Sequence, residues 1–287
     1  MDHRLKTSIF KILSVLPDNL GYFLYHFLQD IGSKQTLGDK IKSTKHTYDT
    51  ILGILQKNNL SLKGMKIAEL GSGWVPILPY LLILEGKAKE IVTYDVNEHY
   101  NVNEIKKVND FYRKYEDFEI KKNEKYPLHE AVCYFPKKDI CKGDLEDVDL
   151  IVSRFVLEHV LPIDIKKMHG YFSSNLKTGS YVLHLISPSD HRAYSDSALS
   201  LQDFLKYSET EWDKIQTKFD YHNRLRLPQY LAIFEKEFDI VFVEHDRIDA
   251  NSVAYSKFKA LVIHDDFKVF SEQELMAGSI NVLLRKK

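Results

Sequence analysis

The sequence predicts an α/β fold in which helices cover an open, mostly parallel β-sheet. From residue 65 onward, short apolar runs alternate with longer segments of helical spacing. The first of these runs ends in a turn, Gly71-Ser72-Gly73, that leads into an apolar helical segment. The chain has 287 residues, of which 44% are hydrophobic, and this is enough for one large core. We therefore expect one sheet-based domain.

The elements of this domain follow in order along the chain. We expect strands at residues 65–70, 90–95, 131–135, 148–153, 181–186, 238–244 and 279–284, the last of them antiparallel. Helices are expected at residues 77–84, 102–115, 163–175 and 228–236. Residues 187–227 break this rhythm because they are polar, aromatic and histidine-bearing. We interpret them as an inserted substrate cap, since such insertions often follow the carboxyl ends of strands.

The chain before the sheet, residues 1–60, is predicted to be an N-terminal helical extension of the main domain, residues 61–287. Its apolar residues recur at helical spacing: Ile9, Phe10, Ile12, Leu13 and Leu16. Polar residues and a proline interrupt every run before the ~20 residues that a membrane span needs, so we expect neither a span nor a signal peptide. Two alternatives stay open for these helices: packing on the main domain, or peripheral contact with a membrane or a partner.

Charge and cysteine content limit the class of protein. The 41 acidic and 40 basic residues give a net charge of -1, which argues against a nucleic-acid partner. Cys133 and Cys141 lack the spacing of a disulfide framework or a zinc motif, so we expect reduced thiols in a cytoplasmic protein. The 12 histidines include no His-x-x-x-His pair with a carboxylate placed to complete a metal site. The sequence therefore predicts no metal site, and it leaves metal dependence and oligomeric state open.

The segment from Glu69 to Trp74 carries the main functional signal. Glycine is needed where the backbone turns sharply beside a ligand, and the N–H groups of the following helix can hold an anion. A nucleotide-type cofactor is therefore indicated. A dinucleotide fingerprint would need glycine at the position of Pro76, which disfavours a nicotinamide cofactor. Asp95 ends the next strand, 24 residues after Gly71, and its two oxygens suit the hydroxyl groups of a ribose. This residue does not discriminate a nicotinamide cofactor from another nucleotide-type cofactor.

Glu69, Gly71 and Gly73 resemble the first motif of the class I S-adenosylmethionine-dependent methyltransferases, a family with a Rossmann-like sheet. In that family the acidic residue lies beside the methionine end of the cofactor; Val75 departs from the family's third small residue. Residues 149–160 and the turn at residues 175–180 also resemble the family, and they separate it from the dehydrogenases. The resemblance implies S-adenosyl-L-methionine as cofactor, with these binding residues: Glu69, Gly71, Ser72, Gly73, Trp74, Asp95, Val96, Asp139, Ile140, Ser153, Arg154 and Phe155.

Methylation of a hydroxyl group requires an aligned acceptor oxygen and a base for its proton. Histidine suits this task because its pKa lies near neutrality. We predict His191 as the base because it opens the insertion after the fifth strand. Asp190 would orient its imidazole or bind a substrate hydroxyl, and His159 is the second catalytic candidate. His184 lies inside a strand and is predicted to be a hydrogen-bonded core histidine.

Polar and aromatic side chains of the cap are predicted to contact the acceptor: Arg192, Tyr207, Asn223, Arg224 and Arg226. The alternative is a cap whose aromatic rings pack and whose arginines pair with acids. The order of its Asp-His, Phe-Leu-Lys-Tyr-Ser, Trp and Asn-Arg-Leu-Arg segments resembles bacterial methyltransferases of surface-polysaccharide biosynthesis. That resemblance implies O-methylation of a sugar, a glycan or another polar small molecule. A nicotinamide-dependent oxidoreductase and a non-catalytic cofactor-binding partner module are the alternatives.

Overall fold

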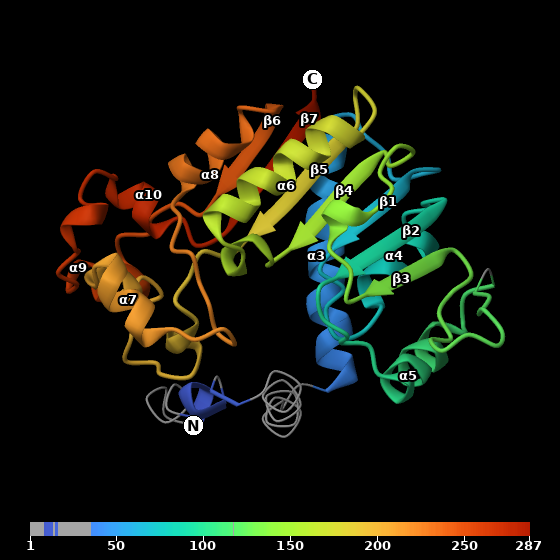
Figure 1. Ribbon diagram of the computed structural model, residues 1–287, viewed down its shortest axis with the longest axis horizontal. Helices are drawn as coiled ribbons and strands as arrows, with labels where there is room; N and C mark the ends of the chain where they lie inside the picture. The colour runs from blue at the N-terminus through green and yellow to red at the C-terminus, as the bar shows by residue number, and fades with distance from the viewer. Residues whose placement is uncertain (1–8, 14, 17–35, 117) are drawn as a thin grey trace.

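The chain folds around one seven-stranded sheet with the strand order β3-β2-β1-β4-β5-β7-β6 (Figure 1). The structure, a computed structural model, describes residues 9–13, 15–16, 36–116 and 118–287. The strands are β1 (Lys66–Leu70), β2 (Glu90–Asp95), β3 (Val132–Pro136), β4 (Leu150–Arg154), β5 (Tyr181–Ile186), β6 (Phe238–His245) and β7 (Ile280–Lys286). β1 to β5 are parallel, and β7 is antiparallel to both β5 and β6. The predicted mostly parallel sheet with an antiparallel last strand is confirmed.

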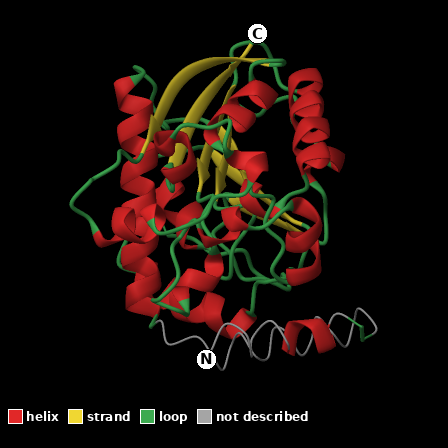
Figure 2. Cartoon of the chain, turned by 90° about the vertical axis from the view of Figure 1, so that its left-hand side faces the viewer, coloured by secondary structure: helices red, strands yellow, loops and turns green. Residues whose placement is uncertain are grey.

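Helices lie on both sides of the sheet (Figure 2). One face packs against α3 (Leu37–Lys57), α4 (Ile77–Leu84) and α5 (Val102–Tyr112), and the other against α6 (Pro162–Asn175) and α8 (Leu227–Phe234). Successive side chains of a strand point to opposite faces, so in β4 Leu150 and Val152 join the first core and Ile151 joins the second. The sheet is therefore buried on both faces, and the predicted cofactor residues lie at or after the carboxyl ends of its strands.

The described part of the N-terminal region packs on the main domain. Thr36 and Asp39 form a capping box that starts α3, and buried residues of that helix share the core of β1. The predicted extension therefore shares one core with the sheet at its α3 end. Phe10 is buried, and its ring lies 6.2 Å from that of Phe219 in the cap, whereas Ile12 is exposed. The rest of the predicted N-terminal helices lies outside the described residues, and no described helix is long and apolar enough to span a membrane.

Two insertions, rather than one, build the cap. The predicted insertion holds η3 (His191–Tyr194), η4 (Asp203–Lys206) and α7 (Glu209–Ile215). A second segment between β6 and β7, absent from our prediction, holds α9 (Val253–Lys259), η5 (Asp265–Phe267) and α10 (Glu272–Met276). The two segments share a small core of Phe204, Leu205, Trp212, Phe258, Phe267 and Leu275. The cap is thus a packed unit beside the ends of β4 and β5 (Figure 1).

Candidate functional site

The turns after β1 and β4 meet at Gly71. Its φ is +85°, and a Cβ built there would lie 2.6 Å from Cγ2 of Val156. The loop after β4 also includes Phe155, a non-glycine residue with φ of +54°. Only glycine tolerates both the left-handed backbone and this close approach. The predicted tight turn is therefore present, and the loop after β4 fixes its position.

Asp95 connects the end of β2 to the same turn. Its Oδ2 accepts hydrogen bonds from the Ser72 amide at 2.9 Å and the Ser72 hydroxyl at 3.1 Å, and its Oδ1 accepts one from the Asn97 amide at 2.8 Å. Asp95 is 9% exposed. A carboxylate has about four acceptor positions, so these three bonds leave it capacity for a ligand hydroxyl.

Glu69 is a buried carboxyl group that lacks a hydrogen-bond partner at Oε2. Burial raises its pKa to about 8. The hydroxyl oxygen of Tyr100 is likewise buried without a hydrogen-bond partner. Buried polar atoms are normally paired, because leaving them unpaired costs about 1–3 kcal/mol each. A ligand group that carries positive charge or N–H donors fits this environment.

The other predicted cofactor residues occupy varied surroundings. Trp74, Val96 and Phe155 are exposed, and the Trp74 ring lies 4.9 Å from the ring of His99. Asp139 caps η1 (Ile140–Lys142) by accepting a bond from the Cys141 amide, while Ile140 is buried. Arg154 donates from Nη2 to the Ser43 hydroxyl of α3 at 3.1 Å, and its buried Nε has no hydrogen-bond partner.

Ser153 requires a correction, because its side chain lies in the core. It is fully buried, and its hydroxyl is 2.6 Å from Nδ1 of His184. Nε2 of His184 is in turn 3.0 Å from Nε2 of His169 on α6. Ser153 therefore partners a buried histidine pair, and we withdraw its side chain from the cofactor residues. The prediction that His184 is a hydrogen-bonded core histidine is confirmed.

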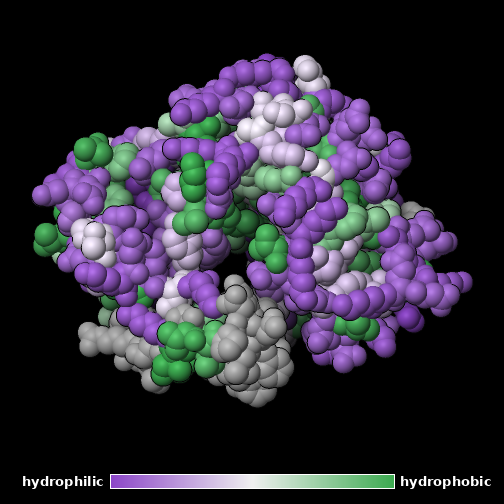
Figure 3. Space-filling view, viewed as in Figure 1, coloured by the Kyte–Doolittle hydropathy of each residue, from purple (hydrophilic) through white to green (hydrophobic). Residues whose placement is uncertain are grey.

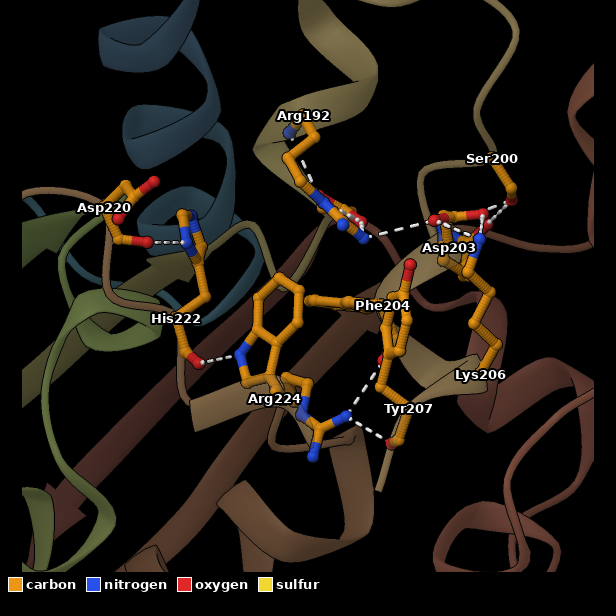
Figure 4. Close-up of polar contacts among 12 residues, drawn as sticks. Arg192, Ser200, Asp203, Phe204, Lys206, Tyr207, Asp220, His222 and Arg224 are labelled. Carbon is orange, nitrogen blue, oxygen red and sulfur yellow. Dashed lines mark hydrogen bonds and ion pairs between the residues drawn. The ribbon is translucent and has the colours of Figure 1, made fainter. Parts of the chain in front are cut away.

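The arginine side chains predicted to bind the acceptor have internal partners instead, as Figure 4 shows for Arg192 and Arg224. Arg224 donates to the carbonyl groups of Phe204 at 2.9 Å and Tyr207 at 2.7 Å, and it pairs with Glu209. Arg226 is fully buried and donates to three carbonyl groups, those of Pro188, Arg224 and Leu275. Burial of a charged guanidinium group costs free energy unless hydrogen bonds compensate it, and these contacts supply them. We therefore replace the predicted substrate contact of both arginines by a structural role.

Asp190 and Arg192 also pair within the cap. The guanidinium group donates to Asp190 at 2.6 Å and to Asp203 at 3.1 Å, and it lies over the ring of Trp212 at 4.9 Å and that of Tyr207 at 5.4 Å. Asp190 also accepts a bond from the Arg192 amide and so caps η3. This carboxylate thus holds the helix of His191, and the bonds it makes are to Arg192 rather than to an imidazole.

Asn223 ties the cap to η2 (Leu157–His159), the turn that follows β4. Its side-chain amide donates to the carbonyl groups of Leu157 at 2.6 Å and Val160 at 2.8 Å. Its backbone amide donates to the carbonyl of Glu158 at 3.0 Å. Asn223 is therefore a positioning residue rather than the substrate contact that we predicted.

Three histidines from three loops come together beside η2. The ring centroids of His159 and His191 are 5.1 Å apart, those of His159 and His222 are 4.6 Å apart, and those of His191 and His222 are 4.1 Å apart. The sequence predicted no metal site, and its histidine spacing gave no sign that these three side chains lie together. His222 was not among our candidates, because no spacing in the sequence connects it to residues 159 and 191. In Figure 3 the surface is hollowed near the centre, where β4 and β5 end in the same view of Figure 1.

Comparison with solved structures identifies the fold. A magnesium protoporphyrin IX methyltransferase from Synechocystis PCC 6803, solved with bound SAH, superposes with a TM-score of 0.51 at 11% identity over 89% of each chain. The chain has the class I methyltransferase fold. A Haemonchus contortus phosphoethanolamine N-methyltransferase 2, solved with S-adenosyl-L-methionine, gives a TM-score of 0.50 at 16% identity over 83% of this chain and 52% of that one. No protein-family model and no curated protein matches the sequence.

The methyltransferase fold differs from the dinucleotide-binding fold at one edge of the sheet. The latter has six parallel strands in the order 3-2-1-4-5-6. Here antiparallel β7 is inserted between β5 and β6. The methyltransferase fold thus places the turn after β1, Asp95 and the loop after β4 at one carboxyl edge, with the cap and its three histidines beside them.

Proposed function

We propose that the chain is an S-adenosylmethionine-dependent methyltransferase that acts on a polar small molecule or a glycan. The observation that carries this proposal is the hydrogen bond that joins the turn at Gly71 to the Asp95 carboxylate. Val156 packs against the same turn, and the sheet has the strand order of the methyltransferase fold. Bound S-adenosyl-L-methionine supplies a methyl group that is already activated by its sulfonium centre. The protein must then bind the cofactor, exclude water and orient the acceptor.

Each part of the proposed cofactor site has a distinct task. Asp95 offers its remaining acceptor capacity to the ribose hydroxyl groups. Glu69, whose Oε2 has no hydrogen-bond partner, offers a carboxyl group to the cationic methionine end. Asp139 and Ile140 would lie against the adenine, and Trp74, Val96, Arg154 and Phe155 would line the same edge.

The acceptor would enter beside η2 and the cap. A hydroxyl group of a sugar or glycan is the proposed acceptor, although the arginines and Asn223 that suggested it hold the cap together instead. His159 and His191 stay as the proposed catalytic groups, now joined by His222. The proposed acceptor oxygen would therefore meet imidazole rings rather than arginine side chains.

Calorimetry with S-adenosylhomocysteine tests the cofactor directly. We expect binding by the purified chain at one site, and no comparable binding of NAD or NADP. A nucleotide panel that favours NAD would establish the oxidoreductase alternative instead. Methyl transfer to any component of a cell-extract acceptor screen would exclude a purely non-catalytic partner module, and an absence of S-adenosylhomocysteine binding would overturn the proposal.

A further inference from the structure

We propose that His159, His191 and His222 form a binding site for a divalent transition-metal ion of the zinc type. One potential ligand atom from each histidine lies within 4.8 Å of the other two. Zinc–nitrogen bonds of 2.0–2.1 Å place tetrahedral ligands roughly 3.4 Å apart, so the rings must close by about an ångström around an ion. Rotation of exposed and half-buried rings supplies a movement of this size.

Backbone carbonyl groups orient two of the three rings. Nδ1 of His159 lies 3.0 Å from the carbonyl oxygen of Tyr221, and Nδ1 of His222 lies 2.8 Å from that of Asp220 (Figure 4). A carbonyl oxygen only accepts, so each Nδ1 carries the hydrogen and each Nε2 carries the lone pair. Metal-binding histidines are typically held in this way, because the bond to the second ring nitrogen fixes both tautomer and orientation.

The loops that bear the histidines are fastened to one another. Asn223 makes three hydrogen bonds to carbonyl groups of residues 157, 158 and 160, which brings His222 beside His159. The Trp212 indole donates to the carbonyl of His222 at 3.1 Å. His191 begins η3, which Asp190 caps by accepting a hydrogen bond from the Arg192 backbone amide. These contacts place the three rings together before any ion arrives, so little loop ordering opposes binding.

The ligand set selects the class of ion. Imidazole nitrogen suits Zn²⁺, Co²⁺, Ni²⁺ and Cu²⁺, whereas Mg²⁺ and Ca²⁺ require oxygen ligands. Three protein ligands leave one position open in a tetrahedral site, as in catalytic zinc centres. His159 is exposed and His191 half-buried, so this position is accessible from the surface.

The role of the ion, unlike the site itself, rests on the proposed function. A cation here lowers the pKa of an acceptor hydroxyl group by acting as a Lewis acid. The proton passes to solvent, the acceptor oxygen bonds to the methyl carbon, and the carbon–sulfur bond of the cofactor breaks to give S-adenosylhomocysteine. The ion would then replace the general base that we predicted at His191.

Titration of the chelator-treated full chain with Co²⁺ tests the site, because tetrahedral cobalt has an intense visible spectrum. We expect one equivalent to bind, Zn²⁺ to displace it, and Mg²⁺ to leave the spectrum unchanged. His222→Ala and His159→Gln should each weaken Co²⁺ binding by roughly 100-fold or more, since each removes one of three ligands. His46→Ala is the matched control, because His46 is exposed on α3 outside the cluster.

Three results would overturn the site: no tetrahedral cobalt spectrum, full binding by His159→Gln and His222→Ala, or equal loss in His46→Ala. His159→Gln changes an exposed residue, so it keeps the test decisive if His222→Ala fails to fold. Parallel calorimetry with S-adenosylhomocysteine separates the two proposals. Metal binding without cofactor binding would retain the site and reject the proposed function, and the reverse would reject the site alone.

Discussion

The backbone amide of Ser72 donates a hydrogen bond to Oδ2 of Asp95 at 2.9 Å, and the Ser72 hydroxyl donates a second one at 3.1 Å. These bonds connect residues 23 positions apart and place the Asp95 carboxylate against the glycine turn. The side chain therefore has two tasks, which are to hold the turn and to accept bonds from a ligand. Variants of Asp95 can measure both.

We expect Asp95→Ala to weaken S-adenosylhomocysteine binding by roughly 100-fold, because bonds to a charged group contribute about 1.5–3 kcal/mol each. Calorimetry measures the affinity, and circular dichroism verifies the fold. Asp110→Ala is the control, since Asp110 is exposed and its carboxylate lies 3.4 Å from the Arg113 side chain, on α5. Equal affinity in Asp95→Ala and the control would remove Asp95 from the cofactor site.

Gly71→Ala should lower the free energy of unfolding by about 2–5 kcal/mol. The left-handed backbone costs about 1–2 kcal/mol for a residue with a Cβ. The clash with Val156, 2.6 Å from the added Cβ, adds an overpacking cost of about 1–3 kcal/mol. Urea denaturation measures the loss.

Gly64→Ala separates the two contributions to that loss. Gly64 also has positive φ, +77°, but no atom lies within 4 Å of an added Cβ. Gly64→Ala should therefore lose only the free energy of unfolding that the left-handed backbone costs a residue with a Cβ, about 1–2 kcal/mol. Adding Val156→Ala to Gly71→Ala should relieve the clash and restore part of the lost free energy of unfolding. If the double variant loses as much stability as the two single variants together, the contact between the two residues is contradicted.

Glu69 should make the stability of the fold depend on pH. Burial raises its folded-state pKa to about 8 from an ordinary value of 4.5. A raised carboxyl pKa favours the protonated form in the fold, so its contribution is complete below the unfolded pKa and is lost as pH rises toward 8. Glu69→Gln stays neutral and avoids this loss. The variant should gain stability over the parent by up to roughly 1.4 kcal/mol per pH unit.

Denaturation of both proteins between pH 5.5 and 8 measures this difference. Other titrating groups are common to parent and variant, so their effects cancel. A difference that does not change with pH would show that Glu69 is ionised in the fold and has a partner. Glu90→Gln serves as the control, because Glu90 is less buried and lies beside Lys66 at 3.8 Å.

The sheet and the cofactor edge could be predicted because their signals are local. An apolar run, a glycine turn and an acidic residue lie within one strand and its connection, as at Glu69 to Gly73. The loop after β4 was found in the same way, although the direction of the Ser153 side chain depends on the histidine pair that it meets in the core.

The cap could not be predicted to the same extent, because its contacts join distant segments. Its second insertion contains helices of seven and five residues, too short for a clear periodicity. The three histidines lie on separate loops that only the folded cap brings together. A buried arginine and a ligand-binding arginine look alike in a sequence, and the partners of Arg226 are carbonyl groups, which no sequence pattern distinguishes.

Arg226 therefore provides the sharpest test of the cap. Its side chain is fully buried, and its guanidinium group donates to the carbonyl groups of Arg224, Leu275 and Pro188, which come from both insertions. Arg226→Met leaves these acceptors buried without donors, at about 1–3 kcal/mol each when no water replaces them. We expect a loss of about 3–5 kcal/mol in the free energy of unfolding, typical of a broken buried network.

Arg226→Lys should lose less, because an ammonium group restores some donors but not the planar fork. Arg113→Met is the control, since Arg113 is 67% exposed. Under conditions where the variants are folded, the affinity of Arg226→Lys for S-adenosylhomocysteine should match that of the parent, because Arg226 lies in the cap. If Arg226→Met instead kept the stability of the parent and lost only turnover, the arginine would bind the acceptor, and the structural role assigned to it here would be wrong.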